Sequence, residues 1–180
     1  MDLKNKLKKT LRNSVRLTIE GEAENKTAAT RFGGKPDVPE NFSWYYYEGE
    51  DSGGNIKKRP LSFIAQFNLA DISKYDTENL LPKTGLLSFF YEAETAPWGF
   101  DPKDRGCARV CYFEDTEKLA PMDFPSDLGE DFRFPAIGIK AKSEDSYQDY
   151  PDFLLQRDKL LECWDDYDIA SKGLKINIPE

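Results

Sequence analysis

The chain has 180 residues, a net charge of −8 at pH 7 and no histidine. Its length suits a single domain, residues 1–180, with a real hydrophobic core, and its aromatic residues, 13% of the chain, supply much of the area to bury. Without histidine, Ser-His-Asp, Cys-His and His-zinc chemistries are excluded. An acidic chain also lacks the clustered basic face that binds nucleic acid. Any enzyme here would work with carboxylates, Lys, Tyr or Cys.

No stretch has the composition of a secretion signal or of a membrane span, so we expect a cytoplasmic protein that does not contact membranes. The cysteines, Cys107, Cys111 and Cys163, form no C-x-x-C pair, which argues against a disulfide framework and a structural zinc site. We therefore expect free thiols, no metal and no cofactor.

The first predicted element is a short amphipathic helix over residues 2–13. Leu3, Leu7 and Leu11 recur there at helical spacing among lysines. Such a helix either lays its leucines on the core or contacts an anionic surface or an acidic partner. A single leucine stripe without aromatic anchors favours the first interpretation.

Strands dominate the following three quarters of the chain. Apolar residues alternate over 15–19, where Gly21 is expected to end the strand, and over 61–69, where Leu61, Phe63, Ala65, Phe67 and Leu69 are expected on one face. Residues 86–91 are apolar on both faces, which is typical of a central strand. Two more strands are expected over 108–113 and 136–141.

The connections between these strands lack the long crossover helices that parallel strands need, so the strands are expected to be antiparallel. Residues 70–81 predict a short helix or turn, and 152–164 predict a helix with Pro151 at its start. The last residues, 174–180, resemble a strand edge. The fold class is therefore mainly β (α+β): an antiparallel twisted sheet or roll with an N-terminal amphipathic helix and one C-terminal helix.

Two glycine-containing loops are the candidate binding sites. The turn Arg31-Phe-Gly-Gly-Lys35 either exposes backbone N–H groups to an anion or makes a tight turn that lets Phe32 enter the core. The loop over 97–106 presents Trp98, Asp101 and Arg105, residue types favoured at interfaces. In the alternative interpretation, Trp98 caps the core while Asp101 and Arg105 pair locally.

Acidic residues suggest two further possibilities. Nine Asp or Glu lie between Ser143 and Asp168, forming either a solvated face or a patch for a basic partner or a cation. A second group could serve a carboxylate-based hydrolase, although such clusters arise freely in an acidic chain; its members are Glu92, Glu94, Asp101 and Asp104.

Three motifs in series resemble the YwqG-like family of bacterial proteins, a domain of unknown function. They are Arg31-Phe-Gly-Gly-Lys-Pro36, Pro60-Leu-Ser-Phe-Ile-Ala-Gln66 and Gly85-Leu-Leu-Ser-Phe-Phe-Tyr91. The resemblance is strongest over roughly residues 15–115 and implies a mainly β, roll-like domain in a soluble bacterial protein, with no established reaction, cofactor or catalytic residue. Family members are typically longer, with a second strand-rich half, so this chain resembles either a C-terminally shortened member or one whose acidic helix and last strand close the sheet differently. It also departs from the family at Tyr45-Tyr-Tyr47.

These observations favour a non-enzymatic module that binds a basic protein partner through an acidic surface, one form of which is an immunity-like role. Its candidate contact residues are Arg31, Trp98, Asp101 and Arg105. The alternative is a small-molecule-binding protein or a carboxylate-based hydrolase. A third hypothesis is structural: a second copy of the chain would complete the sheet and make a homo-oligomer.

Overall fold

The computed structural model describes residues 3–24, 26–147 and 164–172. The chain divides into two compact units. The larger comprises Leu17–Lys74 and Asn79–Ala141, and the smaller comprises Met1–Arg16, Tyr75–Glu78 and Lys142–Glu180.

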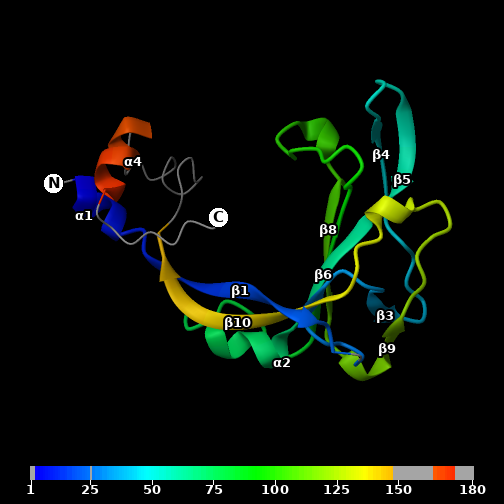
Figure 1. The fold of residues 1–180 in the computed structure, drawn as a ribbon, viewed down its shortest axis with the longest axis horizontal. Coiled ribbons are helices and arrows are strands. Elements are labelled where there is room, and N and C mark those ends of the chain that lie inside the picture. The colour runs from blue at the N-terminus through cyan, green and yellow to red at the C-terminus, as the bar shows by residue number, and fades with distance from the viewer. Residues whose placement is uncertain (1–2, 25, 148–163, 173–180) are drawn as a thin grey trace. The chain divides into compact units, whose positions relative to one another are not determined.

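The described residues are mainly β, as the sequence predicts (Figure 1). In chain order the strands are β1 (Arg12–Glu22), β2 (Arg31–Phe32), β3 (Asp37–Pro39), β4 (Tyr46–Glu50), β5 (Ile56–Pro60), β6 (Ser62–Asn68), β7 (Leu86–Tyr91), β8 (Ala108–Phe113), β9 (Leu119–Pro121) and β10 (Ile137–Ser146). The helices are α1 (Leu3–Lys8), α2 (Leu69–Ile72) and α4 (Trp164–Ser171), with single 3-10 turns η1 (Ser73–Tyr75), η2 (Pro102–Asp104), η3 (Thr116–Lys118) and η4 (Glu130–Phe132). None of these helices has the length and apolar composition that crossing a membrane requires.

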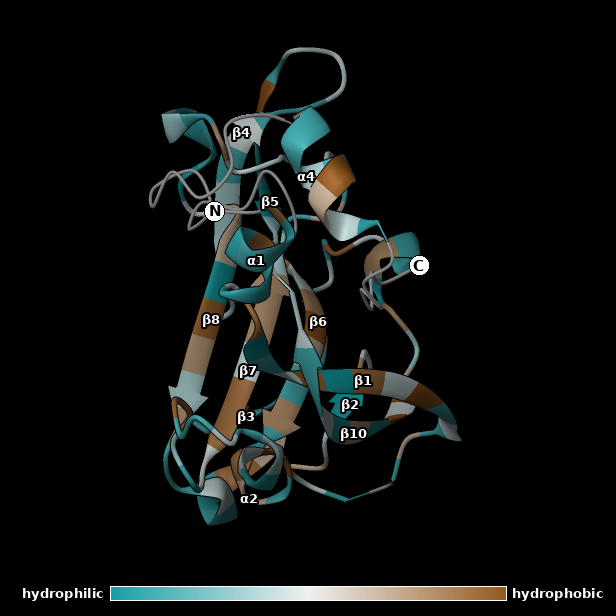
Figure 2. Ribbon diagram, turned by 90° about the vertical axis from the view of Figure 1, so that its left-hand side faces the viewer, coloured by the Kyte–Doolittle hydropathy of each residue, from teal (hydrophilic) through white to brown (hydrophobic). Residues whose placement is uncertain are grey.

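One sheet of six strands has the order β1-β10-β2-β6-β7-β8, and two ribbons are formed by β3 with β9 and by β4 with β5. From β10 to β8 each neighbouring pair of the sheet is antiparallel, and so is each ribbon. Figure 2 shows β6, β7 and β8 side by side, with β8 outermost. The predicted antiparallel arrangement is confirmed.

The strands β6, β7 and β8 lie where the sequence predicts strands. β1 does not end at Gly21, however, because that glycine adopts a φ of 111°, which lets the strand bend and continue to Glu22. β10 likewise runs five residues beyond its predicted end at Ala141, to Ser146.

In the smaller unit, α1 packs against α4. Leu7 of α1 and Ala170 of α4 are fully buried. α1 ends earlier than predicted, because the buried Thr10 hydroxyl donates to the Leu7 carbonyl oxygen and closes the helix. The helix predicted over 152–164 and the strand edge predicted over 174–180 lie outside the described residues, apart from Trp164, where α4 begins.

A β-bulge in β6 changes which residues share a face of the sheet. Phe63 is paired with Phe90 and Ala65 with Phe89, so Ile64 is the extra residue. The bulge puts Phe63 on the same face as Gln66, opposite to Ala65 and its neighbour Phe67. The prediction that the odd-numbered residues of 61–69 share one face is therefore wrong.

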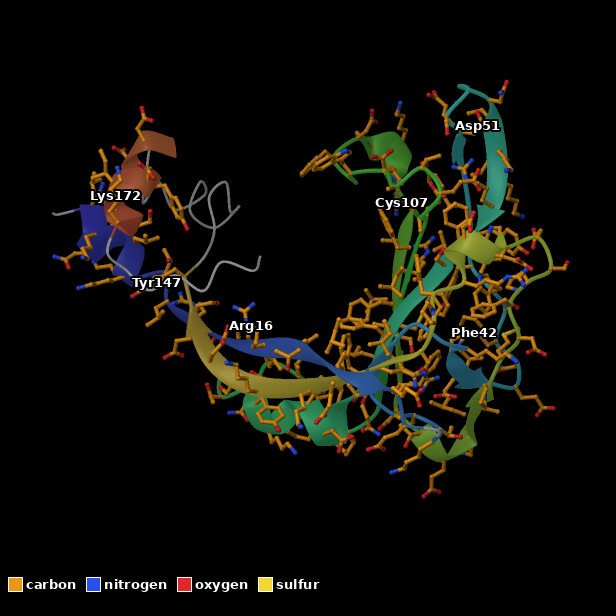
Figure 3. All side chains as sticks on the ribbon, viewed as in Figure 1. Arg16, Phe42, Asp51, Cys107, Tyr147 and Lys172 are labelled. Atoms are coloured by element: carbon orange, nitrogen blue, oxygen red, sulfur yellow. The ribbon has the colours of Figure 1, made fainter. Side chains whose placement is uncertain are left out.

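An aromatic core covers one face of β6, β7 and β8. Its centre is Phe90, which stacks on Phe42 with ring centroids 5.8 Å apart and meets Trp44 edge-on at 5.6 Å. The indole N–H of Trp44 donates to the Leu61 carbonyl oxygen. The segment before β4, which carries Phe42 and Trp44, is thereby held against the sheet. Figure 3 shows the side chains packed around Phe42.

Cys107 and Cys111 belong to this core as free thiols. Burial raises the pKa of both, so neither is a ready nucleophile at neutral pH. The Cys111 Sγ lies 3.4 Å from the hydroxyl oxygen of Tyr45, and their hydrogen bond, with burial, raises the pKa of Tyr45 to about 12.

The segment Arg31–Lys35 forms a tight turn and does not expose its N–H groups to an anion. Gly33 and Gly34 both have positive φ, 59° and 74°. Their N–H groups donate to the carbonyl oxygens of Ile64 and Phe134, so neither is left to bind an anion. Phe32 packs edge-on against Phe67 at 6.3 Å.

We predict that Gly33→Ala destabilises the protein by about 3 kcal/mol, because alanine resists the left-handed backbone and its Cβ would meet the carbonyl oxygen of Pro135 inside contact distance. Gly54→Ala is the matched control: φ is 80°, but the added Cβ meets nothing within 4 Å. It should cost only about 1 kcal/mol. Urea unfolding measures both, and equal costs would contradict the close approach at Gly33.

Candidate functional site

A buried ion pair joins the β4–β5 ribbon to the end of β7. The guanidinium of Arg59 on β5 faces the carboxylate of Glu92, with Nε–Oε1 at 3.3 Å and Nη2–Oε2 at 3.4 Å. Both residues are at most 2% exposed. Arg59 also donates to the carbonyl oxygens of Gly49 and Glu50, which belong to the same ribbon.

Glu92 is held as a carboxylate by its neighbours. Burial alone would raise its pKa, but hydrogen bonds from Thr95 and Arg59, with the charge of Arg59, lower it. The Thr95 hydroxyl and the N–H groups of Glu94 and Thr95 all donate to the same carboxylate. Glu92 therefore fixes both the ribbon and the first residues of the loop that follows.

That loop, residues 93–106, is called the aromatic loop below. Its base is closed by the Glu92 N–H donating to the Cys107 carbonyl oxygen at 2.8 Å, at the position labelled Cys107 in Figure 3. The Tyr91 hydroxyl donates to the Pro97 carbonyl oxygen at 2.6 Å. The two ends of the loop are therefore tied to the sheet.

The far half of the aromatic loop is ordered by two aspartates. Asp101 precedes Pro102 and caps η2, accepting from the Lys103 N–H, a pairing that both residue types favour at a helix start. Asp104 accepts from the Gly99 N–H at 3.0 Å. Gly99 lies between Trp98 and Phe100, so this bond fixes the backbone that carries both rings.

Trp98 and Phe100 point into solvent although the loop is held by hydrogen bonds. They are 86% and 87% exposed, and their rings stack with centroids 6.4 Å apart and planes 19° apart. The side chains of Asp101 and Arg105 lie on the same loop and are also exposed. Three predicted site residues thus lie exposed on one loop: Trp98, Asp101 and Arg105.

The fourth predicted site residue, Arg31, belongs to a separate buried cluster. Its guanidinium donates to Asp37 on β3 at 3.0 Å and to the carbonyl oxygens of Ala29 and Lys35. The amide of Gln66 on β6 donates to the same Asp37 oxygen at 2.6 Å. Arg31 therefore joins the β3–β9 ribbon to the sheet.

A pocket of about 350 Å³ lies beside the Arg31–Lys35 turn, lined in part by Lys26, Arg31, Lys35 and Asp37. Its volume is within the usual range of small-ligand sites. Two of its cations already have carboxylate partners: Arg31 pairs with Asp37 and Lys35 with Asp123. A second cavity, of about 30 Å³, adjoins Arg59 and Glu92 and has room for no more than ordered water.

The carboxylates proposed for hydrolase chemistry have structural partners. Glu92 has a lowered pKa, the wrong direction for a general acid. Asp101 and Asp104 accept backbone N–H groups, and Glu94 pairs with Lys57 at 3.3 Å. Across the described ranges, no group of three or more His, Cys, Asp or Glu is placed to hold a metal ion.

A family model described as "Domain of unknown function (DUF1963)" matches residues 30–175. The chain belongs to the DUF1963 family. The match covers both buried Arg–carboxylate pairs and the whole aromatic loop. A search of curated proteins finds no match to the chain.

Phe100 and Arg59 were not among the residues predicted for a site, and Glu92 was predicted only as one of the possible hydrolase carboxylates. The spacing Trp98-Gly-Phe100 followed by Asp101-Pro102 is the sequence signal for the ring pair, since a glycine and an Asp-Pro cap make a turn that presents flanking side chains. Nothing in the sequence pairs Arg59 with Glu92, because 33 residues separate them.

We predict that Glu92→Gln lowers the unfolding free energy by about 3 kcal/mol at pH 7, because it leaves the buried Arg59 charge unpaired. The pKa of Glu92 is lowered from 4.5. Its stabilisation is therefore present above pH 4.5 and is lost as the pH falls through the folded-state value. The difference in unfolding free energy between wild type and variant should therefore decrease at acidic pH. Urea unfolding measured over a range of pH checks this.

Glu94→Gln is the control for this variant. Glu94 is a near neighbour whose pair with Lys57 is exposed, so its loss should cost under about 1 kcal/mol. A Glu92→Gln cost no larger than this at pH 7 would contradict the role given to the buried pair.

Proposed function

We propose that this protein is a non-enzymatic module that binds another protein through the aromatic loop. The observation that carries the proposal is the stacked, solvent-exposed pair Trp98 and Phe100 on a loop held by hydrogen bonds. Large exposed rings are the residue types that dominate binding energy at interfaces. A loop that is already ordered loses little conformational entropy when it binds.

The chemistry of the partner follows from charge. The chain carries a net charge of −8, and the loop that bears the exposed rings also carries Glu94, Asp101 and Asp104 together with Lys103 and Arg105. An apolar pocket for the two rings, rimmed by basic residues, would complement this surface. An immunity-like role, in which the module covers a basic active site, is one form of the proposal.

The alternative, a small-molecule-binding protein, has weaker support. The pocket beside Arg31 has sufficient volume, but Arg31 and Lys35 are paired within the chain. The hydrolase alternative is disfavoured by the lowered pKa of Glu92.

We further infer that the chain is a YwqG-like member of its family, from a bacterium, and acts in the cytoplasm. The three motifs that resemble the YwqG-like family all fall within the residues that the family model matches. The free thiols of Cys107 and Cys111 are consistent with a reducing compartment.

The test is partner capture by the wild type and by the double variant Trp98→Ala with Phe100→Ala. A protein captured in stoichiometric amount is identified, purified and titrated against both chains by calorimetry. We expect the double variant to bind at least about a hundredfold more weakly, since two central aromatic residues are lost. Its melting temperature should be unchanged, because both rings are exposed.

Leu80→Ala is the matched control, since Leu80 is an exposed apolar side chain on another loop, at 78% exposure. It should leave the affinity unchanged. Equal binding by wild type and the double variant would refute the aromatic loop as the contact surface, and capture of no stoichiometric partner by the wild type would count against the binding module itself.

A further inference from the structure

The strand β8 is a free edge of the six-stranded sheet. Among the described residues it pairs with β7 alone, at the end of the strand order. The outer side of such a strand carries N–H and C=O groups that have no strand to bond to, and these can pair with a further strand. Figure 2 shows β8 in this outermost position beside β7.

β8 lacks the features that usually protect an edge. From Ala108 to Phe113 it contains no proline and one charged residue, Arg109. Val110 and Tyr112 are 61% and 44% exposed on the same face of the strand. Natural edge strands are usually interrupted by proline, bulges or several charges that prevent further pairing.

The apolar face of β8 continues into the sheet. Val110 lies opposite Phe89 of β7, and Tyr112 lies opposite Leu87. Phe89 in turn meets Phe67 of β6 edge-on at 5.4 Å. A further strand paired with β8 would continue this apolar face and cover Val110 and Tyr112, which are otherwise exposed at its edge.

The charges that flank β8 indicate that the strand pairing with it is β8 of a second copy. The start of the strand is basic, with Arg105 and Arg109, and its end is acidic, with Glu114 and Glu117; all four are exposed. A second β8 placed antiparallel brings the basic start of each copy beside the acidic end of the other. The sequence around β8 is thus self-complementary in the antiparallel sense, which is the condition for a two-fold symmetric interface.

We propose that two copies of this chain associate edge to edge through antiparallel pairing of their β8 strands. Val110 of each copy lies opposite Tyr112 of the other, a β-branched and aromatic pair of the kind that stabilises neighbouring strands. The interface is small, so the dimer forms in a concentration-dependent equilibrium with the monomer. This inference does not rest on partner binding by the aromatic loop, although Arg105 belongs to both surfaces.

Analytical ultracentrifugation of the full chain over a range of concentrations tests the proposal. The mass should rise from 20.6 kDa toward twice that value. Val110→Lys should remove the rise, since it sets a charge opposite an aromatic ring at the seam. The control Ile56→Lys, which changes an apolar side chain on β5 that is 67% exposed, should retain it.

Charge reversal tests the antiparallel sense. One variant carries Arg105→Glu with Arg109→Glu, and the other carries Glu114→Arg with Glu117→Arg. In the homodimer of either variant, like charges face one another at both ends of the paired strands. The dissociation constant of that homodimer should rise on the order of tenfold, because two symmetric sets of contacts change from attractive to repulsive. Mixed together, the two variants should form a heterodimer as tight as the wild-type dimer, although both remain net negative.

A monomer mass at every concentration would overturn the proposal. So would a dimer that survives Val110→Lys, or two reversal variants that stay monomeric when mixed. A monomeric chain whose Val110→Lys variant loses a captured partner would assign the β8 edge to another protein instead. The Trp98→Ala and Phe100→Ala variant should dimerise normally, so failure of one proposal is distinguishable from failure of the other.

Discussion

Two buried Arg–carboxylate pairs determine how the larger unit is assembled. Arg31 and Asp37 join the β3–β9 ribbon to the sheet, and Arg59 and Glu92 join the β4–β5 ribbon to the end of β7. A buried pair adds little net stability compared with apolar residues of the same size, but breaking one leaves a charge without a partner in the interior. Each pair therefore specifies which ribbon meets which strand, and the aromatic core around Phe90 supplies the burial that stabilises the result.

The pair Arg59–Glu92 also links the fold to the proposed function. Glu92 accepts from Arg59 on one side and from the first N–H groups of the aromatic loop on the other. The same carboxylate thus connects the ribbon, the sheet and the loop that presents Trp98. Exposed aromatic rings are unfavourable in water, and here they are carried on an ordered loop rather than a loose one. This combination is typical of a surface that binds a partner.

The sequence predicts the positions of the strands better than it predicts which side chains contact one another. Sequence patterns place β6, β7 and β8 correctly: apolar residues alternate along β6, and β7 is a run that is apolar on both faces, as expected for a central strand. Sequence reasoning misses the bulge at Ile64, since nothing local distinguishes the extra residue, and so assigns Ala65 to the wrong face. Trp98 and Asp101 were predicted from a Gly-containing loop with residue types favoured at interfaces, and the structure places both on an exposed loop. Arg31 is assigned to the binding site because its ion pair with Asp37 cannot be seen without the fold.

Amide hydrogen exchange in the aromatic loop tests most directly whether its rings are presented by an ordered backbone. The N–H groups of Gly99 and Lys103 lie at the surface but donate to Asp104 and Asp101. If the loop is ordered before binding, both should exchange slower than in an unstructured peptide by about two orders of magnitude. Exchange of both amides at the unstructured rate would show a loose loop and contradict the proposed preorganised binding surface.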